Sequence, residues 1–222
     1  MVIPKYSQRV LLNEIRNYSL PYMHMYGMRL FPLNSIKTIL DIGANCGLYS
    51  VAFRFFQPNA RIISIEPDKE NYNNLIKNTA NLDIETLNIA LGDGNEVCKI
   101  TGKCSLAHSF SNISTETLEK EKCTSLLLNN IIEKYKIDLK GLFIKIDTEG
   151  GEYVIFGHAP SENVIKNSIG VSMEVHHCIS NVIDKNETIV WANKFSNNHK
   201  IFCSSHRRWS HISIFSKEIF YE

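Results

Sequence analysis

The sequence lacks the features that mark membrane, secreted and disulfide-stabilised proteins. In its 222 residues no apolar run approaches the roughly 20 residues that a membrane span needs. The N-terminal stretch "MVIPKYSQRVLLNEIRNYSL" contains no apolar core of a signal peptide. The six cysteines form no Cys-x-x-Cys pair and show no zinc-finger spacing. These absences predict a cytoplasmic protein with reduced thiols.

An excess of charge of either sign is also missing. The 24 lysines and arginines nearly balance the 23 aspartates and glutamates, which leaves a formal net charge of +1. The molecule as a whole therefore gives no electrostatic reason to bind nucleic acid or an anionic membrane. No internal repeat or low-complexity linker divides the chain. We predict one main domain over residues 35–222, preceded by an N-terminal helical lid or brace over residues 1–34.

From residue 36 onward, strand-like and helix-like segments alternate. Strands are predicted at 36–42, 61–67, 84–91, 141–147, 168–175, 200–205 and 211–216. Helices are predicted at 47–57, 68–82, 125–136, 149–159 and 185–197, whereas 95–123 is ambiguous between a hairpin and a long loop. The alternation favours an α/β fold with a mostly parallel, seven-stranded sheet covered by helices on both faces. The last two strands favour an antiparallel hairpin at one edge.

The turn after the first strand, "DIGANCG" (41–47), lacks the signatures of phosphate binding. A dinucleotide site needs Gly-x-Gly-x-x-Gly, but Asn45 stands between Gly43 and Gly47 where the second glycine belongs. The Gly-Lys-Ser/Thr of a P-loop is absent too. A ligand with a sulfonium, an ammonium and a carboxylate but no phosphate fits better, and S-adenosylmethionine (SAM) is such a ligand. We predict that Asp41 meets its cationic end and that the backbone at both glycines approaches its methionine portion. Ala44, Asn45 and Ser50 complete this part of the predicted cofactor site.

The ends of the next two strands add candidates for the nucleoside portion. Glu66 follows the second strand, where a carboxylate can accept hydrogen bonds from both ribose hydroxyls. Its alternative role is that of a carboxylate near a helix N-terminus, and Pro67 stops the strand beside it. In "ALGD", Ala90 and Asp93 are placed to flank the adenine, although Asp93 can equally be a turn residue.

Five segments of the chain resemble the FkbM family of SAM-dependent methyltransferases. They are "ILDIGANCGLYS", "SIEPDKENYNNL", "NIALGD", "FIKIDTEGGE" and "MEVH", in the family's order and at its spacing across about residues 36–177. The resemblance implies a class I, Rossmann-like methyltransferase with SAM as cofactor. It also implies O-methylation of a hydroxyl of a sugar, glycan or similar small acceptor.

The segments "KIDTEG" and "MEVH" carry the candidate catalytic groups. Asp147 is expected to face the cofactor methyl and the acceptor, Glu149 follows on the first turn of a helix, and His176 is the natural base. The alternatives are carboxylates that only stabilise a helix N-terminus and a structural histidine. Asp147 and Glu174 end two strands that can be neighbours, so Mg²⁺ between them is a further hypothesis. Lys145 either faces the active edge or pairs with a carboxylate inside the sheet.

Two other functions stay open from the sequence. One is N-methylation of a small molecule or of nucleic acid, and the other is a binding module without activity. The turn "SSHRRWSH" (204–211) can stack a sugar or a base on Trp209, or it can be a solvated turn. The strand end "KIDTEG" differs from the Asn/Asp-Pro-Pro-Tyr ends of base-modifying enzymes, which favours a small hydroxylated acceptor.

Overall fold

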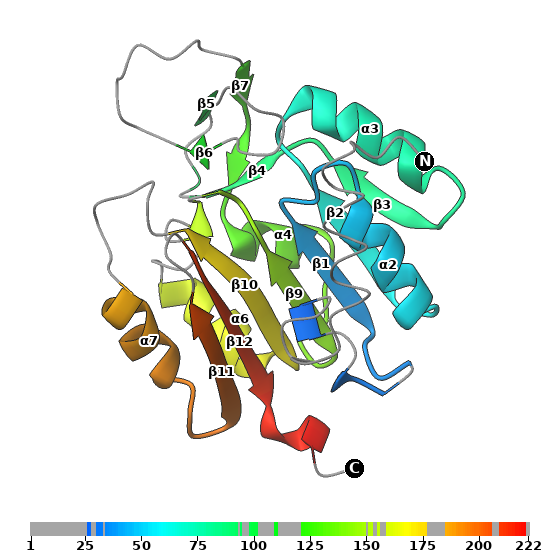
Figure 1. Ribbon diagram of the computed structural model, residues 1–222. Helices are drawn as coiled ribbons and strands as arrows, with labels where there is room; N and C mark the ends of the chain where they lie inside the picture. The colour runs from blue at the N-terminus through cyan, green and yellow to red at the C-terminus, as the bar shows by residue number, and fades with distance from the viewer. Residues whose placement is uncertain are drawn as a thin grey trace.

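The computed structural model describes most of the chain from Tyr26 to Phe220 (Figure 1). The described residues are 26–27, 30–32, 34–92, 94, 98–101, 109–110, 121–149, 151–152, 155, 159–176, 185–205 and 209–220. The N-terminal lid predicted over residues 1–34 lies largely outside these ranges, so that division of the chain stays a prediction.

A seven-stranded mixed sheet forms the centre of the molecule (Figure 1). From one edge to the other its strands are β3 (Ile84–Leu87), β2 (Arg61–Ile65), β1 (Thr38–Ile42), β9 (Leu142–Ile146), β10 (Gly170–His176), β12 (Trp209–Ser216) and β11 (His199–Ser205). The first five are parallel, and β12 runs antiparallel to both of its neighbours. The predicted α/β class, the mostly parallel sheet of seven strands and the C-terminal hairpin are therefore confirmed.

The helices lie close to their predicted positions, with two differences. They are α2 (Leu48–Phe56), α3 (Lys69–Thr79), α4 (Leu128–Lys134), α6 (Ala159–Asn167) and α7 (Lys185–Asn193), and a 3₁₀ turn, η2 (Lys217–Phe220), follows β12. Helix α3 begins where the Asp68 side chain accepts a hydrogen bond from the Asn71 amide, as an N-cap does. Helix α6 was not predicted, and most of the helix predicted at 149–159 lies outside the described residues. No helix in the described ranges is long and apolar enough to cross a membrane.

The strand predicted at 84–91 is divided into two. After β3 the Asn88 side chain donates hydrogen bonds to the carbonyls of Glu66 and Pro67, both at 2.9 Å, and turns the chain away from the sheet. Residues Ala90–Leu91 then form β4, which pairs with β8 (Ser125–Leu126). Residues 125 and 126 were predicted to begin a helix, but they form β8, and α4 therefore begins only at Leu128. The ambiguous segment 95–123 contains a small antiparallel sheet of β5 (Cys98–Thr101), β6 (Ser109–Phe110) and β7 (Glu121–Cys123).

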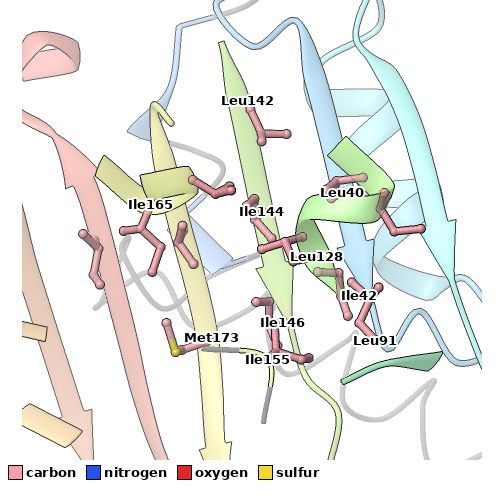
Figure 2. Packing of buried hydrophobic residues seen from close by; sticks show 14 of the residues in the cluster. Leu40, Ile42, Leu91, Leu128, Leu142, Ile144, Ile146, Ile155, Ile165 and Met173 are labelled. Atoms are coloured by element: carbon pink, nitrogen blue, oxygen red, sulfur yellow. The ribbon is translucent and has the colours of Figure 1, made fainter. Parts of the chain in front are cut away.

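Each face of the main sheet has its own hydrophobic core. On one face, Leu40 and Ile42 join the apolar side chains of α4, α6 and α7, and Figure 2 shows part of this cluster. The other face is the one against which Phe53 of α2 packs, and we call it the α2 face. There Ile39 joins aromatic residues, and Phe31 packs edge-on against Phe143 with 5.3 Å between the ring centroids. Because side chains alternate along a strand, Asp41 projects into the same face as Ile39. That face carries the polar groups of the candidate site.

His211 on β12 should make the fold sensitive to acid. Its Nε2 lies 2.8 Å from the Ser172 hydroxyl and 3.2 Å from that of Ser213, and the ring is buried. Burial lowers the pKa of His211 from 6.5 to about 4, against the opposing charge of Glu174. The unfolded chain therefore binds more protons than the folded one between these values. The stabilisation is complete above pH 6.5 and is lost as the pH falls towards 4.

We expect this residue alone to remove about 2 kcal/mol of unfolding free energy between pH 7 and pH 5. Urea denaturation at both pH values should show that loss in the wild type and a correspondingly smaller loss in His211→Gln, which cannot titrate. Other groups titrate in both proteins and cancel in the comparison. Equal losses in the two proteins would contradict the assignment.

Candidate active site

A row of buried polar side chains crosses five neighbouring strands on the α2 face. The strand register places Asp41 beside Ser64 and Lys145, and Ser172 beside Lys145 and Ser213. All five are at most 1% exposed. Buried polar groups need partners, so this row constrains how the strands pack. A second row of residues lies two positions further along, towards the carboxyl ends of the parallel strands, which we call the active edge. It consists of Glu66, Gly43, Asp147, Glu174 and His211.

The ion pair of Asp41 and Lys145 is the centre of the buried row. Lys145 Nζ lies 3.2 Å from Asp41 Oδ1, as an ion-pair partner rather than a well-aligned hydrogen-bond donor. It donates a hydrogen bond of 2.8 Å to the Gly43 carbonyl, and Ser50 Oγ donates one of 2.6 Å to Asp41 Oδ2. Burial by itself lowers the pKa of Lys145, but Asp41 and then Asp147 raise it above its usual value. Lys145 is therefore charged. Of the two roles that the sequence left open for it, the structure shows pairing with a carboxylate inside the sheet.

Neighbouring atoms of the protein itself explain why both positions of the first turn are glycine. A Cβ on Gly43 would lie 1.7 Å from the carbonyl oxygen of Asp147, and a Cβ on Gly47 would lie 2.7 Å from Leu75 Cδ1 of α3. Both have positive φ, +73° and +86°, which side chains rarely adopt. The close approach made by Gly43 therefore joins the ends of β1 and β9. Its approach to a cofactor stays a prediction.

Glu66 holds the glycine turn against the end of β2. Its Oε2 accepts a hydrogen bond from the Asn45 amide at 2.8 Å, and its Oε1 accepts one from the Asp68 amide at 3.0 Å. Burial raises the pKa of Glu66 to about 7 despite these two bonds. The Ala44 amide also donates to the Ile65 carbonyl. Among the other predicted cofactor residues, Ala90 is buried in β4, and Asp93 lies outside the described residues.

Three carboxylates surround the ring of His176 at the end of β10. Nδ1 lies 3.3 Å from Glu152 Oε1, and Nε2 lies 3.3 Å from Glu149 Oε2 and 3.5 Å from Glu174 Oε1. Burial acts to lower the pKa of His176, but Glu152 and Glu174 together raise it to about 11. The ring is therefore an imidazolium in this arrangement. A base must begin without its proton, so this geometry favours His176 as a positive partner for the carboxylates.

Asp147 and Glu149 are carboxylates with unusually high proton affinity. Burial raises the pKa of Asp147 to about 6, opposed by Lys145, and that of Glu149 to about 7, opposed by His176. The Tyr26 hydroxyl donates a hydrogen bond of 2.9 Å to Asp147 Oδ2. Glu149 has φ +52°, a left-handed conformation that costs a non-glycine residue energy and occurs often at functional sites.

One potential ligand atom from each of Asp147, Glu149 and His176 lies within 4.8 Å of the others. The predicted metal pair was Asp147 and Glu174, whose strands are indeed neighbours. The structure thus adds Glu149 and His176 to the groups gathered here.

A family model supports the resemblance seen in the sequence. The model described as "Methyltransferase FkbM domain" matches residues 41–185, which is more than half of the chain. The chain belongs to the FkbM methyltransferase family. No curated protein sequence matches it.

Solved structures agree with this FkbM fold. The chain is similar to methyltransferase FkbM from Methylobacillus flagellatus KT, with a TM-score of 0.55, 16% identity, and coverage of 96% of this chain but only 55% of that one. It is also similar to a putative rRNA-methylase from Clostridium thermocellum (TM-score 0.54, 11% identity, 90% and 98% coverage). A fibrillarin/Nop5p complex gives a TM-score of 0.50 at 13% identity, with 83% and 74% coverage. At such identities these matches show the fold.

Tyr26 lies at the candidate site, although the sequence did not reveal it. It lies 121 residues from Asp147 in the chain and belongs to no recognisable motif. Glu152, three residues after the predicted Glu149, also belongs to the site: it contacts His176 and accepts hydrogen bonds from Thr148. Arg207 and Arg208 lie outside the described residues, as does the side chain of Trp209.

The Gly43 contact predicts an unequal effect of two alanine substitutions. Gly43→Ala should lower the unfolding free energy by roughly 3–5 kcal/mol, because its Cβ meets backbone that cannot move without separating β1 from β9. Gly141→Ala is the matched control: its φ is +94°, and the atoms nearest to the added Cβ belong to the Lys37 side chain, with Cγ at 2.8 Å and Cβ at 3.1 Å, and not to backbone. We expect a cost of about 1–2 kcal/mol there. Urea unfolding compares the two, and equal costs would show that φ strain alone explains Gly43.

Proposed function

We propose that the protein is a SAM-dependent O-methyltransferase that acts on a hydroxyl of a small acceptor, with a sugar or glycan end as the preferred class. The family and the fold support methyl transfer from SAM. The observation that carries the proposal is the convergence of Gly43, Glu66, Asp147 and Glu149 at one edge of the sheet, beside a buried ion pair that fixes the first turn.

The donor set at this edge fits SAM. The sulfonium and ammonium of SAM are positive, and Glu149 and Glu174 form a partly exposed negative rim. Each oxygen of Glu66 accepts one amide hydrogen bond and keeps a second lone pair for a ribose hydroxyl. Asp41 is engaged with Ser50 and Lys145, so we assign it to holding the turn and not to direct contact with the cofactor.

SAM, when bound, supplies an electrophilic methyl group, whose transfer breaks the carbon–sulfur bond and leaves the electron pair on sulfur. The residues must then align an acceptor oxygen and take its proton. We assign proton acceptance to Asp147, whose pKa of about 6 is close to neutrality. Glu149 lies beside it and is oriented by the imidazolium of His176 at 3.3 Å.

Two measurements test this function. Isothermal titration calorimetry with SAM separates an enzyme from a module that has lost the cofactor. A panel of monosaccharides, oligosaccharides, amines and RNA, assayed for methylated product with S-adenosylhomocysteine release, separates O-methylation from N-methylation. We expect SAM binding and methylated sugars. Methylated RNA or amines as the sole products would overturn the acceptor class, and absence of SAM binding would overturn the function.

Substitutions at two aspartates should separate catalysis from cofactor binding. Asp147→Asn should lower kcat by roughly 10²–10⁴-fold with little change in SAM affinity, because it removes only the proton acceptor. Asp41→Ala should mainly weaken SAM binding, because it leaves Lys145 buried without its partner and disturbs the turn. Glu133→Gln, an exposed site on α4, is the matched control. Normal turnover in both aspartate variants would refute the site.

Mg²⁺ is the second candidate for activating the acceptor, favoured by the close approach of potential ligand atoms from Asp147, Glu149 and His176. We expect turnover to persist after chelation with EDTA, because the imidazolium of His176 already supplies positive charge among these carboxylates. The assay uses the acceptor found in the panel, with Mg²⁺ and Mn²⁺ added back separately. Loss of activity on chelation with recovery on Mg²⁺ addition would instead establish the metal.

A further inference from the structure

Tyr26 is held in place much more firmly than its position before the first strand suggests. Its side chain is buried, and its backbone has φ +55°, followed by Gly27 at +75°. A bulky residue adopts such a φ only where the surrounding contacts overcome the strain. The ring meets Tyr49 edge-on at 4.8 Å, lies 5.1 Å from the ring of His211, and sits 5.3 Å from Lys145 Nζ.

The backbone of Asp147 is fixed independently of Tyr26. Its amide donates to the Ile42 carbonyl at 3.1 Å, and its own carbonyl lies against Gly43. These contacts place the Cα of Asp147 but leave its carboxylate free to rotate. The direction of the carboxylate must therefore come from its side-chain partners.

The hydrogen bond from Tyr26 and the ion-pair contact with Lys145 act on one oxygen, while ligand atoms of Glu149 and His176 lie within 4.8 Å of the carboxylate. Oδ2 accepts the Tyr26 hydrogen bond at 2.9 Å and faces Lys145 Nζ at 4.0 Å. Within the described ranges no hydrogen bond reaches Oδ1, and the side chain is 25% exposed. At 2.9 Å the bond from Tyr26 is an O–H···O hydrogen bond of ordinary length. It holds Oδ2 towards Tyr26 and leaves Oδ1 without a hydrogen bond from the described residues.

We propose that Tyr26 is a positioning residue, which orients the carboxylate of Asp147 so that Oδ1 faces the acceptor hydroxyl. A residue far from every sequence motif thereby completes the site. The proposal rests on the methyl-transfer function assigned to Asp147 above, but its geometric part does not depend on which acceptor is used.

The test compares Tyr26→Phe with the wild type and with Tyr72→Phe. Tyr26→Phe keeps the buried ring and removes only the hydroxyl. Tyr72→Phe removes a hydroxyl that donates to the Thr86 carbonyl on β3, away from Asp147. Crystal structures of the three proteins, grown without acceptor, report the orientation of the Asp147 carboxylate. Turnover is measured with SAM and the best acceptor of the monosaccharide panel.

In Tyr26→Phe we expect the carboxylate to rotate or to occupy several conformers, and kcat to fall roughly ten- to a hundredfold. The KM for SAM should change by less than about threefold, and Tyr72→Phe should match the wild type. An unchanged carboxylate orientation in Tyr26→Phe would overturn the proposal. So would a loss of SAM affinity as large as the loss of kcat, because that would indicate a structural role. If the wild type methylates no acceptor, the function fails while the crystal comparison still decides the role of Tyr26.

Discussion

The rest of the site depends on one buried ion pair, between Asp41 on β1 and Lys145 on β9. Two charges inside a hydrophobic core are costly unless they face each other and are further hydrogen-bonded, and removal of one partner typically costs about 3–5 kcal/mol. Here Ser50 donates a hydrogen bond to one oxygen of the aspartate, the lysine faces the other, and the Gly43 carbonyl accepts a hydrogen bond from the lysine. The same contacts fix the glycine turn and the end of β9. The glycine turn and the end of β9 are therefore held at one separation.

Above this pair, the carboxylates at the edge of the sheet are held close together at a cost. Desolvation raises the pKa values of Asp147 and Glu149, and the imidazolium of His176 offsets part of the repulsion. Such clusters of perturbed groups are characteristic of active sites, where a proton must be exchanged near neutral pH. In this arrangement the neighbouring carboxylates raise the pKa of His176, which the sequence offers as a base, and so favour its positively charged form.

Several features could be read before the structure, because they depend on local patterns. Alternation of strands and helices predicted the sheet and its hairpin, and the helix predicted from residue 68 begins at Lys69, with Asp68 as its N-cap. The division at Asn88 could not be foreseen, because its side chain contacts the carbonyls of Glu66 and Pro67, which precede it by some 20 residues. The close approach signalled by Gly43 was recognised, but its partner, the carbonyl of Asp147, is distant in sequence.

The sequence by itself determined the fold class, the membership of the FkbM family and the strand ends that carry polar groups, since periodicity and motifs are local properties. Only the tertiary structure decided which groups meet. It paired Lys145 with Asp41, enclosed His176 among carboxylates and brought Tyr26 to Asp147. The physical reason is that strand register and burial set the distances between charges, and these distances decide which groups are protonated and which oxygens are left free.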